Sequence, residues 1–177
     1  MTNFKHLAEQ VLEIEIEGLN AVKDAIDDKF VQIIELLRVT KGKVIFSGMG
    51  KSGHIANKIA ATMSSIGMPS IFVHPSEASH GDLGMITKDD VVFLLSNSGE
   101  TKELIDIINY CKRFGIKMIA IVRRKTSLLV EQADIAIILP EIPEASDVNA
   151  PTTSTTMMLA YGDAISIVLA KSKGLKL

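Results

Sequence analysis

The stretch Val91–Glu103, VVFLLSNSGETKE, decides the fold that we expect for this chain. It opens with the apolar run Val91–Leu95, which is too short for an ordinary helix and suits a strand buried on both faces of a parallel sheet. The polar loop Ser96–Gly99 follows, and a helical repeat of apolar residues then covers Glu100–Phe114. Such a loop gathers free backbone N–H groups, hydroxyls and the positive end of a helix at one point, which is where phosphate binds. The same residues would also serve as an ordinary turn with a helix cap.

Composition and charge indicate what class of protein this is and argue against certain partners. The chain has 177 residues, 47% of them hydrophobic and 23% charged, which is typical of one globular domain. A net charge of −2 and an aromatic content of 5% without Trp argue against a nucleic-acid partner. The single Cys111 has no partner for a disulfide, and no apolar run is long enough to cross a bilayer. We therefore predict a cytoplasmic protein without a membrane partner.

Further strands and helices alternate along the chain, which indicates βαβ units and a parallel sheet covered on both faces. We expect one domain over residues 1–177, with N-terminal helices over 1–40 and an α/β core over 41–177. The N-terminal helical pattern is broken near Gly18 or at Asp27-Asp28, and it either packs on a second subunit or covers its own core. The other expected strands are Lys43–Ser47, Ile71–His74, Lys117–Val122 and Ile135–Leu139, and the other expected helices are Ile55–Ile66, Ser127–Ala133 and Thr152–Leu175.

Polar side chains follow four of the five expected strands. Ligands of parallel sheets bind beyond the carboxyl ends of the strands, so these loops should meet at one site. The glycines at 48, 50 and 53 have GxGxxG-like spacing, but the acidic ribose partner of a dinucleotide site is missing after the next strand. The loops carry Lys51 and Ser52 after the first strand, His74 and His80 after the second, Ser96, Ser98 and Thr101 after the third, and Glu144 after the fifth.

Three blocks of sequence are similar to the sugar isomerase (SIS) domain family, and within it to the arabinose-5-phosphate isomerases of 3-deoxy-D-manno-octulosonate (Kdo) synthesis. They are GMGKSGHIANKIAATMSSIGMPSIFVHPSEASHGDLGMI (Gly48–Ile86), LSNSGETKE (Leu95–Glu103) and APTTSTTMMLAYGDAISIVL (Ala150–Leu169). The resemblance implies a three-layer αβα sandwich with a five-stranded parallel sheet and a homotetramer with sites shared between subunits. It also implies interconversion of D-ribulose 5-phosphate and D-arabinose 5-phosphate without an organic cofactor.

The resemblance also assigns roles to residues. Lys51, Glu103 and Glu144 match catalytically important positions, and His80 and His74 match substrate-site histidines. His74 further matches the contact of an inhibitory zinc ion. Aldose–ketose isomerisation needs a base, an electrophile for the developing enediolate and an anchor for the phosphate. The expected substrate and phosphate contacts are Ser52, Gly67, Met68, His74, Ser96, Asn97, Ser98, Gly99, Glu100, Thr101, Thr152 and Ser154.

Two departures from the family pattern keep other functions open. Related enzymes carry a histidine-containing SHPGG-type segment and paired CBS domains after the final helix, whereas this sequence ends at Leu177. The segment after the fifth strand reads EASDVNAPTTST where related enzymes read EACPLGLAPTSST. The alternatives are a 3-hexulose-6-phosphate isomerase and a non-catalytic sensor of sugar phosphates. Without the resemblance, Glu103 would also suit a structural acid at a helix start, and Lys51 an ordinary surface lysine.

Overall fold

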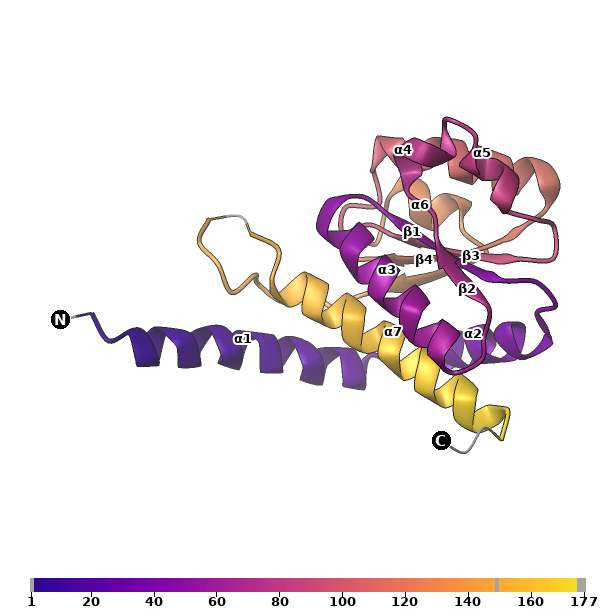
Figure 1. Cartoon of the computed structure of the whole chain (residues 1–177). Coiled ribbons are helices and arrows are strands. Elements are labelled where there is room, and N and C mark those ends of the chain that lie inside the picture. Colours follow the sequence, from indigo (N-terminus) through magenta and orange to yellow (C-terminus); the bar gives the residue numbers. More distant parts are fainter. Residues whose placement is uncertain (1, 149, 175–177) are drawn as a thin grey trace.

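Five parallel strands form the centre of the molecule, and helices cover both faces of the sheet (Figure 1). The computed structural model describes residues 2–148 and 150–174. The order of the strands is β2-β1-β3-β4-β5, with every neighbouring pair parallel. The α/β three-layer prediction is therefore confirmed. The strands are β1 (Val44–Gly48), β2 (Ser70–Phe72), β3 (Val91–Leu95), β4 (Lys117–Val122) and β5 (Ile135–Ile138).

Successive side chains of each strand point to opposite faces of the sheet, and helices cover both of these faces. Phe46 and Phe93 stack with their ring centroids 4.8 Å apart and belong to the core beneath α2, α3 and α7. Val92 and Leu94 point the other way, into the core beneath α4, α5 and α6. The helices are α1 (Phe4–Asp24), α2 (Asp28–Val39), α3 (Gly50–Ser65), α4 (Pro75–Ala78), α5 (Ile105–Phe114), α6 (Leu128–Gln132) and α7 (Thr153–Ser172), with 3-10 helices η1 (Asp82–Met85) and η2 (Lys102–Leu104).

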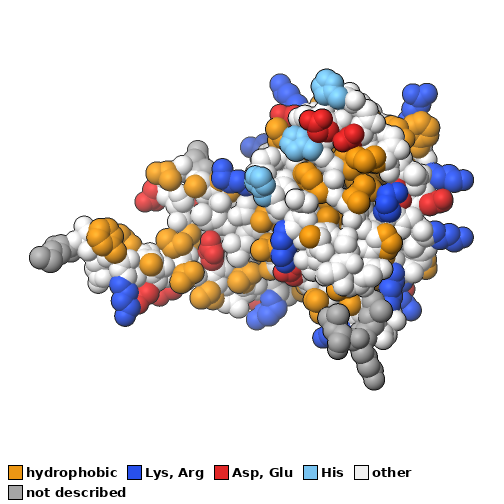
Figure 2. All heavy atoms as spheres, viewed as in Figure 1, with side chains coloured by type: hydrophobic (Ala, Val, Ile, Leu, Met, Phe, Trp, Pro, Cys, Tyr) orange, Lys and Arg blue, Asp and Glu red, His pale blue; other side chains and the backbone are white. Residues whose placement is uncertain are grey.

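The N-terminal helical segment breaks at Asp27, one of the two predicted places. The Asp27 side chain accepts the N–H of Lys29 at 2.9 Å and starts α2. Helix α1 extends away from the body of the molecule, and only Gly18 and Val22 on it are buried (Figure 1). Its apolar stripe is therefore exposed over most of its length (Figure 2). Phe4 is 78% exposed and Leu12 is 58% exposed. The prediction that α1 merely covers its own core is wrong for this part of the helix.

Two carboxylates join neighbouring strands at the amino end of the sheet. Asp90, just before β3, accepts the N–H groups of Lys43 at 2.6 Å and Thr87 at 2.8 Å. Asp134, just before β5, accepts the N–H of Met118 at 2.9 Å. Each carboxylate also pairs with a lysine ammonium, from Lys43 at 3.3 Å and from Lys117 at 2.8 Å respectively. These contacts fix the starts of the strands relative to one another.

The outer strand β5 is partly covered by α2. The Lys29 ammonium donates a hydrogen bond to the carbonyl of Ala136 in β5 at 2.9 Å. A charged side chain therefore stands at the open side of the sheet. Among the helices that the structure describes, none has the length and apolar character needed to cross a membrane.

Candidate functional site

The predicted site residues follow strands that all point the same way, so most of them lie at the carboxyl end of the sheet. Strand β2 lies on one side of β1, while β3, β4 and β5 lie on the other. The chain therefore changes direction between β1 and β3, and open α/β sheets bind their ligands at such a point. Gly48 and Leu95, the last residues of these two strands, are paired in the sheet. The loops that carry Lys51 and Ser96 thus start side by side.

A hollow of about 510 Å³ opens beyond β3, β4 and β5. We call it the β3–β5 hollow. Its volume lies in the range of small-molecule sites in proteins. It brings together the loop after β3, two arginines after β4 and the irregular segment after β5. The lining residues are Asn97, Ser98, Arg123, Arg124, Glu141, Glu144 and Pro151.

The loop after β3 is held in shape by its own hydroxyls. The Ser96 hydroxyl is buried, accepts the N–H of Gly99 at 3.0 Å and lies 2.8 Å from the Thr101 hydroxyl. The Ser98 hydroxyl accepts the N–H of Glu100 at 3.2 Å. Among the described residues, the N–H groups of Asn97, Ser98 and Thr101 have no acceptor. We conclude that Ser96 and Thr101 shape the loop, while backbone N–H groups are its free donors.

This loop is also attached to α6, and the predicted helix start at Glu100 is wrong. Glu100 accepts the N–H of Leu128 at 3.0 Å, and Gly99 accepts that of Leu129 at 3.1 Å. Gly99 has a φ of +69°, and a Cβ there would overlap the Ser127 hydroxyl. The 3-10 turn η2 follows before α5 begins at Ile105. The positive end of α5 is therefore set back from the loop.

Of the predicted catalytic residues, Glu144 has the most hydrogen bonds to its side chain. Its Oε2 accepts the N–H groups of Thr152 at 2.8 Å and Ser154 at 3.1 Å, at the start of α7. Its Oε1 lies 3.6 Å from the Nη1 of Arg123. Burial raises the pKa of Glu144, but hydrogen bonds from Ser154 and Thr152 outweigh burial and hold the pKa below its ordinary value. The carboxylate is ionised at neutral pH and is a weak base in this arrangement.

The predicted residues Thr152 and Ser154 both contact Glu144 at the start of α7, Thr152 through its hydroxyl and Ser154 through its backbone N–H. Thr152 Oγ1 accepts the N–H of Ala145 at 2.9 Å and donates to Glu144 at 3.3 Å. The Ser154 side chain is buried. Neither residue is among those that line the β3–β5 hollow. Both therefore act on the site through Glu144, whose position they fix.

Sequence reasoning missed the two arginines of this hollow. Arg123 and Arg124 follow β4 directly, and Arg123 donates its backbone N–H to the carbonyl of Asn97 at 3.2 Å. The signal was available in KMIAIVRR, where a basic pair ends an apolar strand run. The rule used for the other four loops, that polar residues after a strand reach the carboxyl end of the sheet, applies equally here.

A second, smaller hollow of about 110 Å³ lies beyond β1 and β2. We call it the β1–β2 hollow. Helix α3 begins at Gly50, earlier than the predicted Ile55, so most of the glycine-rich loop forms its first turn. A Cβ at Gly53 would collide with the carbonyl of Gly48, so glycine lets α3 approach β1 closely. The lining residues are Gly48, Gly50, Gly53, His54, Asn57, Phe72 and His74.

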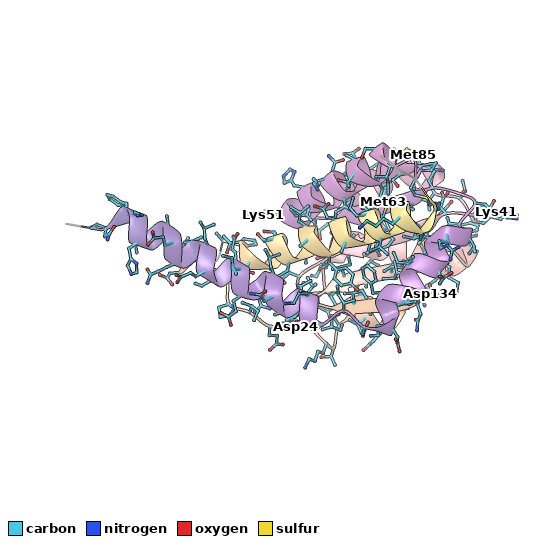
Figure 3. The ribbon with its side chains drawn as sticks, turned by 90° about the horizontal axis from the view of Figure 1, so that it is seen from below. Asp24, Lys41, Lys51, Met63, Met85 and Asp134 are labelled. Atoms are coloured by element: carbon cyan, nitrogen blue, oxygen red, sulfur yellow. The ribbon has the colours of Figure 1, made fainter. Side chains whose placement is uncertain are left out.

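Lys51 and Ser52 both lie in the first turn of α3, but their side chains differ in exposure. Lys51 is exposed at the beginning of the helix (Figure 3). Ser52 is half-buried, and its hydroxyl lies 3.9 Å from the Sδ of Met158 in α7. Lys51 is therefore accessible to a ligand, whereas Ser52 contributes to the contact between α3 and α7.

The predicted histidines lie around the β1–β2 hollow and the α4 loop. His74 is half-buried, and its Nδ1 accepts the N–H of Ser76 at 3.3 Å, which caps α4. His80 is exposed after α4. Within residues 2–148 and 150–174, no three His, Cys, Asp or Glu side chains group together to hold a metal ion. The inhibitory zinc contact of His74 stays a prediction.

Three other predicted residues lie outside both hollows. Glu103 is exposed in η2. Gly67 and Met68 follow the far end of α3, which spans 16 residues, or about 24 Å. They therefore lie near the amino end of the sheet, where Met68 is buried and its Sδ lies 3.4 Å from the Nζ of Lys173. In this chain the fold does not bring Gly67 and Met68 to the other predicted site residues.

Comparison with known proteins identifies the family. A family model described as the SIS domain matches residues 36–168. The chain belongs to the SIS domain family. The predicted family is thus confirmed, and the match covers the sheet and both hollows.

Individual relatives match nearly the whole chain. The uncharacterized protein RP505 of Rickettsia prowazekii is 48% identical over 97% of this chain and 54% of its own length. The arabinose 5-phosphate isomerase KdsD of Pseudomonas aeruginosa is 46% identical over 97% of this chain and 53% of its own. The chain thus spans about half the length of the curated relatives it matches. The solved structure of Escherichia coli CFT073 c3406 in complex with arabinose 5-phosphate has a TM-score of 0.94 and 41% identity, covering 99% of this chain and 95% of that chain.

Proposed function

We propose that this protein is a sugar-phosphate isomerase that interconverts D-ribulose 5-phosphate and D-arabinose 5-phosphate through an enediol. One observation carries the proposal. The β3–β5 hollow combines free loop N–H groups, guanidinium groups and a carboxylate in a chain that is 41% identical, over almost its full length, to a protein solved with arabinose 5-phosphate. We further infer a single domain over residues 1–177 that acts in the cytoplasm and feeds Kdo synthesis for lipopolysaccharide or capsule.

The phosphate of the sugar is assigned to the loop after β3. The N–H groups of Asn97, Ser98 and Thr101 are the free donors there, and the buried Ser96 hydroxyl keeps the loop in one shape. A rigid loop loses little entropy when the anion binds. The phosphate is remote from the reacting carbons, so its binding energy positions them for proton transfer.

The reacting carbons are assigned to the side of Lys51. In the proposed mechanism the Lys51 ammonium stabilises the enediolate oxygen, and His80 opens the ring or relays a proton. Glu103 and Glu144 remain the candidates for proton transfer between C1 and C2. We favour Glu103, because the N–H groups of Thr152 and Ser154 keep Glu144 a weak base. The mechanism uses no organic cofactor.

We infer that the complete site forms between copies of the chain. Lys51, His80 and Glu103 are exposed and do not line the β3–β5 hollow. An assembly of several chains would bring additional groups to these side chains. The exposed apolar stripe of α1 supports such an assembly, because a stripe of this kind is stabilised when a partner covers it. A homotetramer is the assembly that we propose.

The test is an assay of the purified protein with D-ribulose 5-phosphate. We expect D-arabinose 5-phosphate to appear, as followed by chromatography or by NMR of the anomeric proton. Turnover of 3-hexulose 6-phosphate but not ribulose 5-phosphate would assign the alternative isomerase reaction. Binding of arabinose 5-phosphate in calorimetry without turnover of either substrate would contradict the enzyme and support a sensor.

A further inference from the structure

Arg123 is a partly buried cation whose backbone is hydrogen-bonded to the loop after β3. Its side chain is 29% exposed, and its backbone N–H donates to the carbonyl of Asn97 at 3.2 Å. It lines the β3–β5 hollow beside Asn97 and Ser98, whose own N–H groups are free. A cation in this position faces the same space as the loop donors.

The guanidinium of Arg123 makes a long, weak contact with Glu144. Its Nη1 lies 3.6 Å from the Oε1 of Glu144, which is beyond the range of a good hydrogen bond. Among the described residues, no hydrogen bond has this guanidinium as its donor. Arg38 on the protein surface, by contrast, donates to both oxygens of Glu35 at 3.1 and 3.3 Å. A partly buried guanidinium with five unused donors is poised to receive a second anion.

Glu144 does not depend on Arg123 for its hydrogen bonds. The N–H groups of Thr152 and Ser154 and the hydroxyl of Thr152 all donate to its Oε2. These donors are built into the start of α7 and stay in place if the arginine turns away. The ion pair can therefore open without leaving the carboxylate, which is only 19% exposed, unpartnered.

We propose that Arg123 is a phosphate-binding residue that exchanges Glu144 for the phosphate of the ligand held by the N–H groups of Asn97 and Ser98. A phosphate accepts two parallel N–H bonds from a guanidinium, which is a stronger arrangement than the long contact with one carboxylate oxygen. The exchange also uncovers the Oε1 of Glu144 toward the hollow. The inference rests on the proposed function for the identity of the sugar, but not for the binding of a phosphate.

The first test compares Arg123→Gln with Lys125→Gln. Both variants remove one positive charge, but Lys125 is exposed and does not line the hollow. Inorganic phosphate and D-arabinose 5-phosphate are titrated into each protein by calorimetry. We expect Arg123→Gln to weaken both affinities about tenfold or more and Lys125→Gln to change them less than about twofold. Equal affinities of Arg123→Gln and the wild type, or no phosphate binding by the wild type, would overturn the proposal.

The second test separates phosphate binding from a merely structural role of the ion pair. Glu144→Gln removes the competing negative charge but keeps an oxygen that can cap α7. We expect it to tighten phosphate binding in the wild-type background and to lose most of that effect in the Arg123→Gln background. If Arg123 acted only by holding Glu144, Glu144→Gln would weaken phosphate binding as Arg123→Gln does, and the proposal would be wrong.

The two proposals fail in different ways. If the wild type binds phosphate through Arg123 but converts no sugar phosphate, the isomerase function is wrong and the role of Arg123 stands. If the wild type converts ribulose 5-phosphate and Arg123→Gln binds phosphate normally, the isomerase stands and the role of Arg123 is rejected.

Discussion

The two ends of the sheet carry similar residue types but differ in how these residues are used. At the amino end, Asp90 and Asp134 accept backbone N–H groups and pair with lysines. At the carboxyl end, Lys51 is exposed and Arg123 donates no hydrogen bond from its guanidinium among the described residues. Satisfied charges stabilise the fold, whereas unsatisfied ones are available to a ligand. The comparison predicts that substitutions at the amino end change stability and that those at the carboxyl end change activity.

The largest effect is expected for Lys51→Ala. If Lys51 stabilises the enediolate as proposed, removing it should lower kcat by at least about 100-fold, while the melting temperature stays close to that of the wild type. Lys41→Ala is the control, because Lys41 is also exposed but lies at the opposite end of the sheet (Figure 3). Ribulose 5-phosphate turnover and circular dichroism are the measurements. Near-normal kcat in Lys51→Ala would remove this lysine from the mechanism.

The next effect is expected for Asp90→Ala at the amino end. It leaves the N–H groups of Lys43 and Thr87 without their acceptor, and the unfolding free energy should fall by about 2–3 kcal/mol. Urea denaturation measures this loss. Asp89→Ala is the matched control, because its side chain is exposed, and it should change little. If Asp90→Ala lowered kcat of the folded protein instead of its stability, the division between the two ends would be wrong.

The smallest effect concerns pH. Hydrogen bonds outweigh burial and lower the pKa values of Asp90, Asp134 and Glu144 below their ordinary values. A lowered pKa in the folded state contributes stability that is complete above the ordinary value, 3.8 for Asp134, and is lost as pH falls through the lowered one. Urea midpoints measured from pH 6 downward should fall for the wild type and fall less for Asp134→Asn. Parallel curves for the two proteins would contradict this contribution.

The sequence predicted the strands better than the starts of the helices. Val91–Leu95 and Lys117–Val122 have the predicted bounds, because the part of each strand that is buried on both faces is a continuous apolar run. Helices α3 and α5 begin elsewhere than predicted. Glycine at 53 lets the first turn of α3 approach Gly48 closely, and the 3-10 turn η2 replaces the first turn that was predicted for α5.

The sequence predicted which loops form the candidate site, but not which of their side chains contact one another. Ser98 and Glu144 were expected after strands, and both line the β3–β5 hollow. The contact of Glu144 with Arg123 joins residues 21 positions apart and depends on β4 lying beside β5, which local patterns do not reveal. Gly67 was expected at the site from the resemblance alone, and the length of α3 carries it to the other end of the sheet.

The hydrogen bond from Lys29 to Ala136 bears on how copies of this protein can join. An uncovered outer strand is a template to which a strand of another molecule can add, and a lysine placed there discourages that addition. Sheets from neighbouring molecules are therefore not expected to join through β5. Growth toward fibrous aggregates is disfavoured at β5, and association is left to helical surfaces such as the stripe on α1.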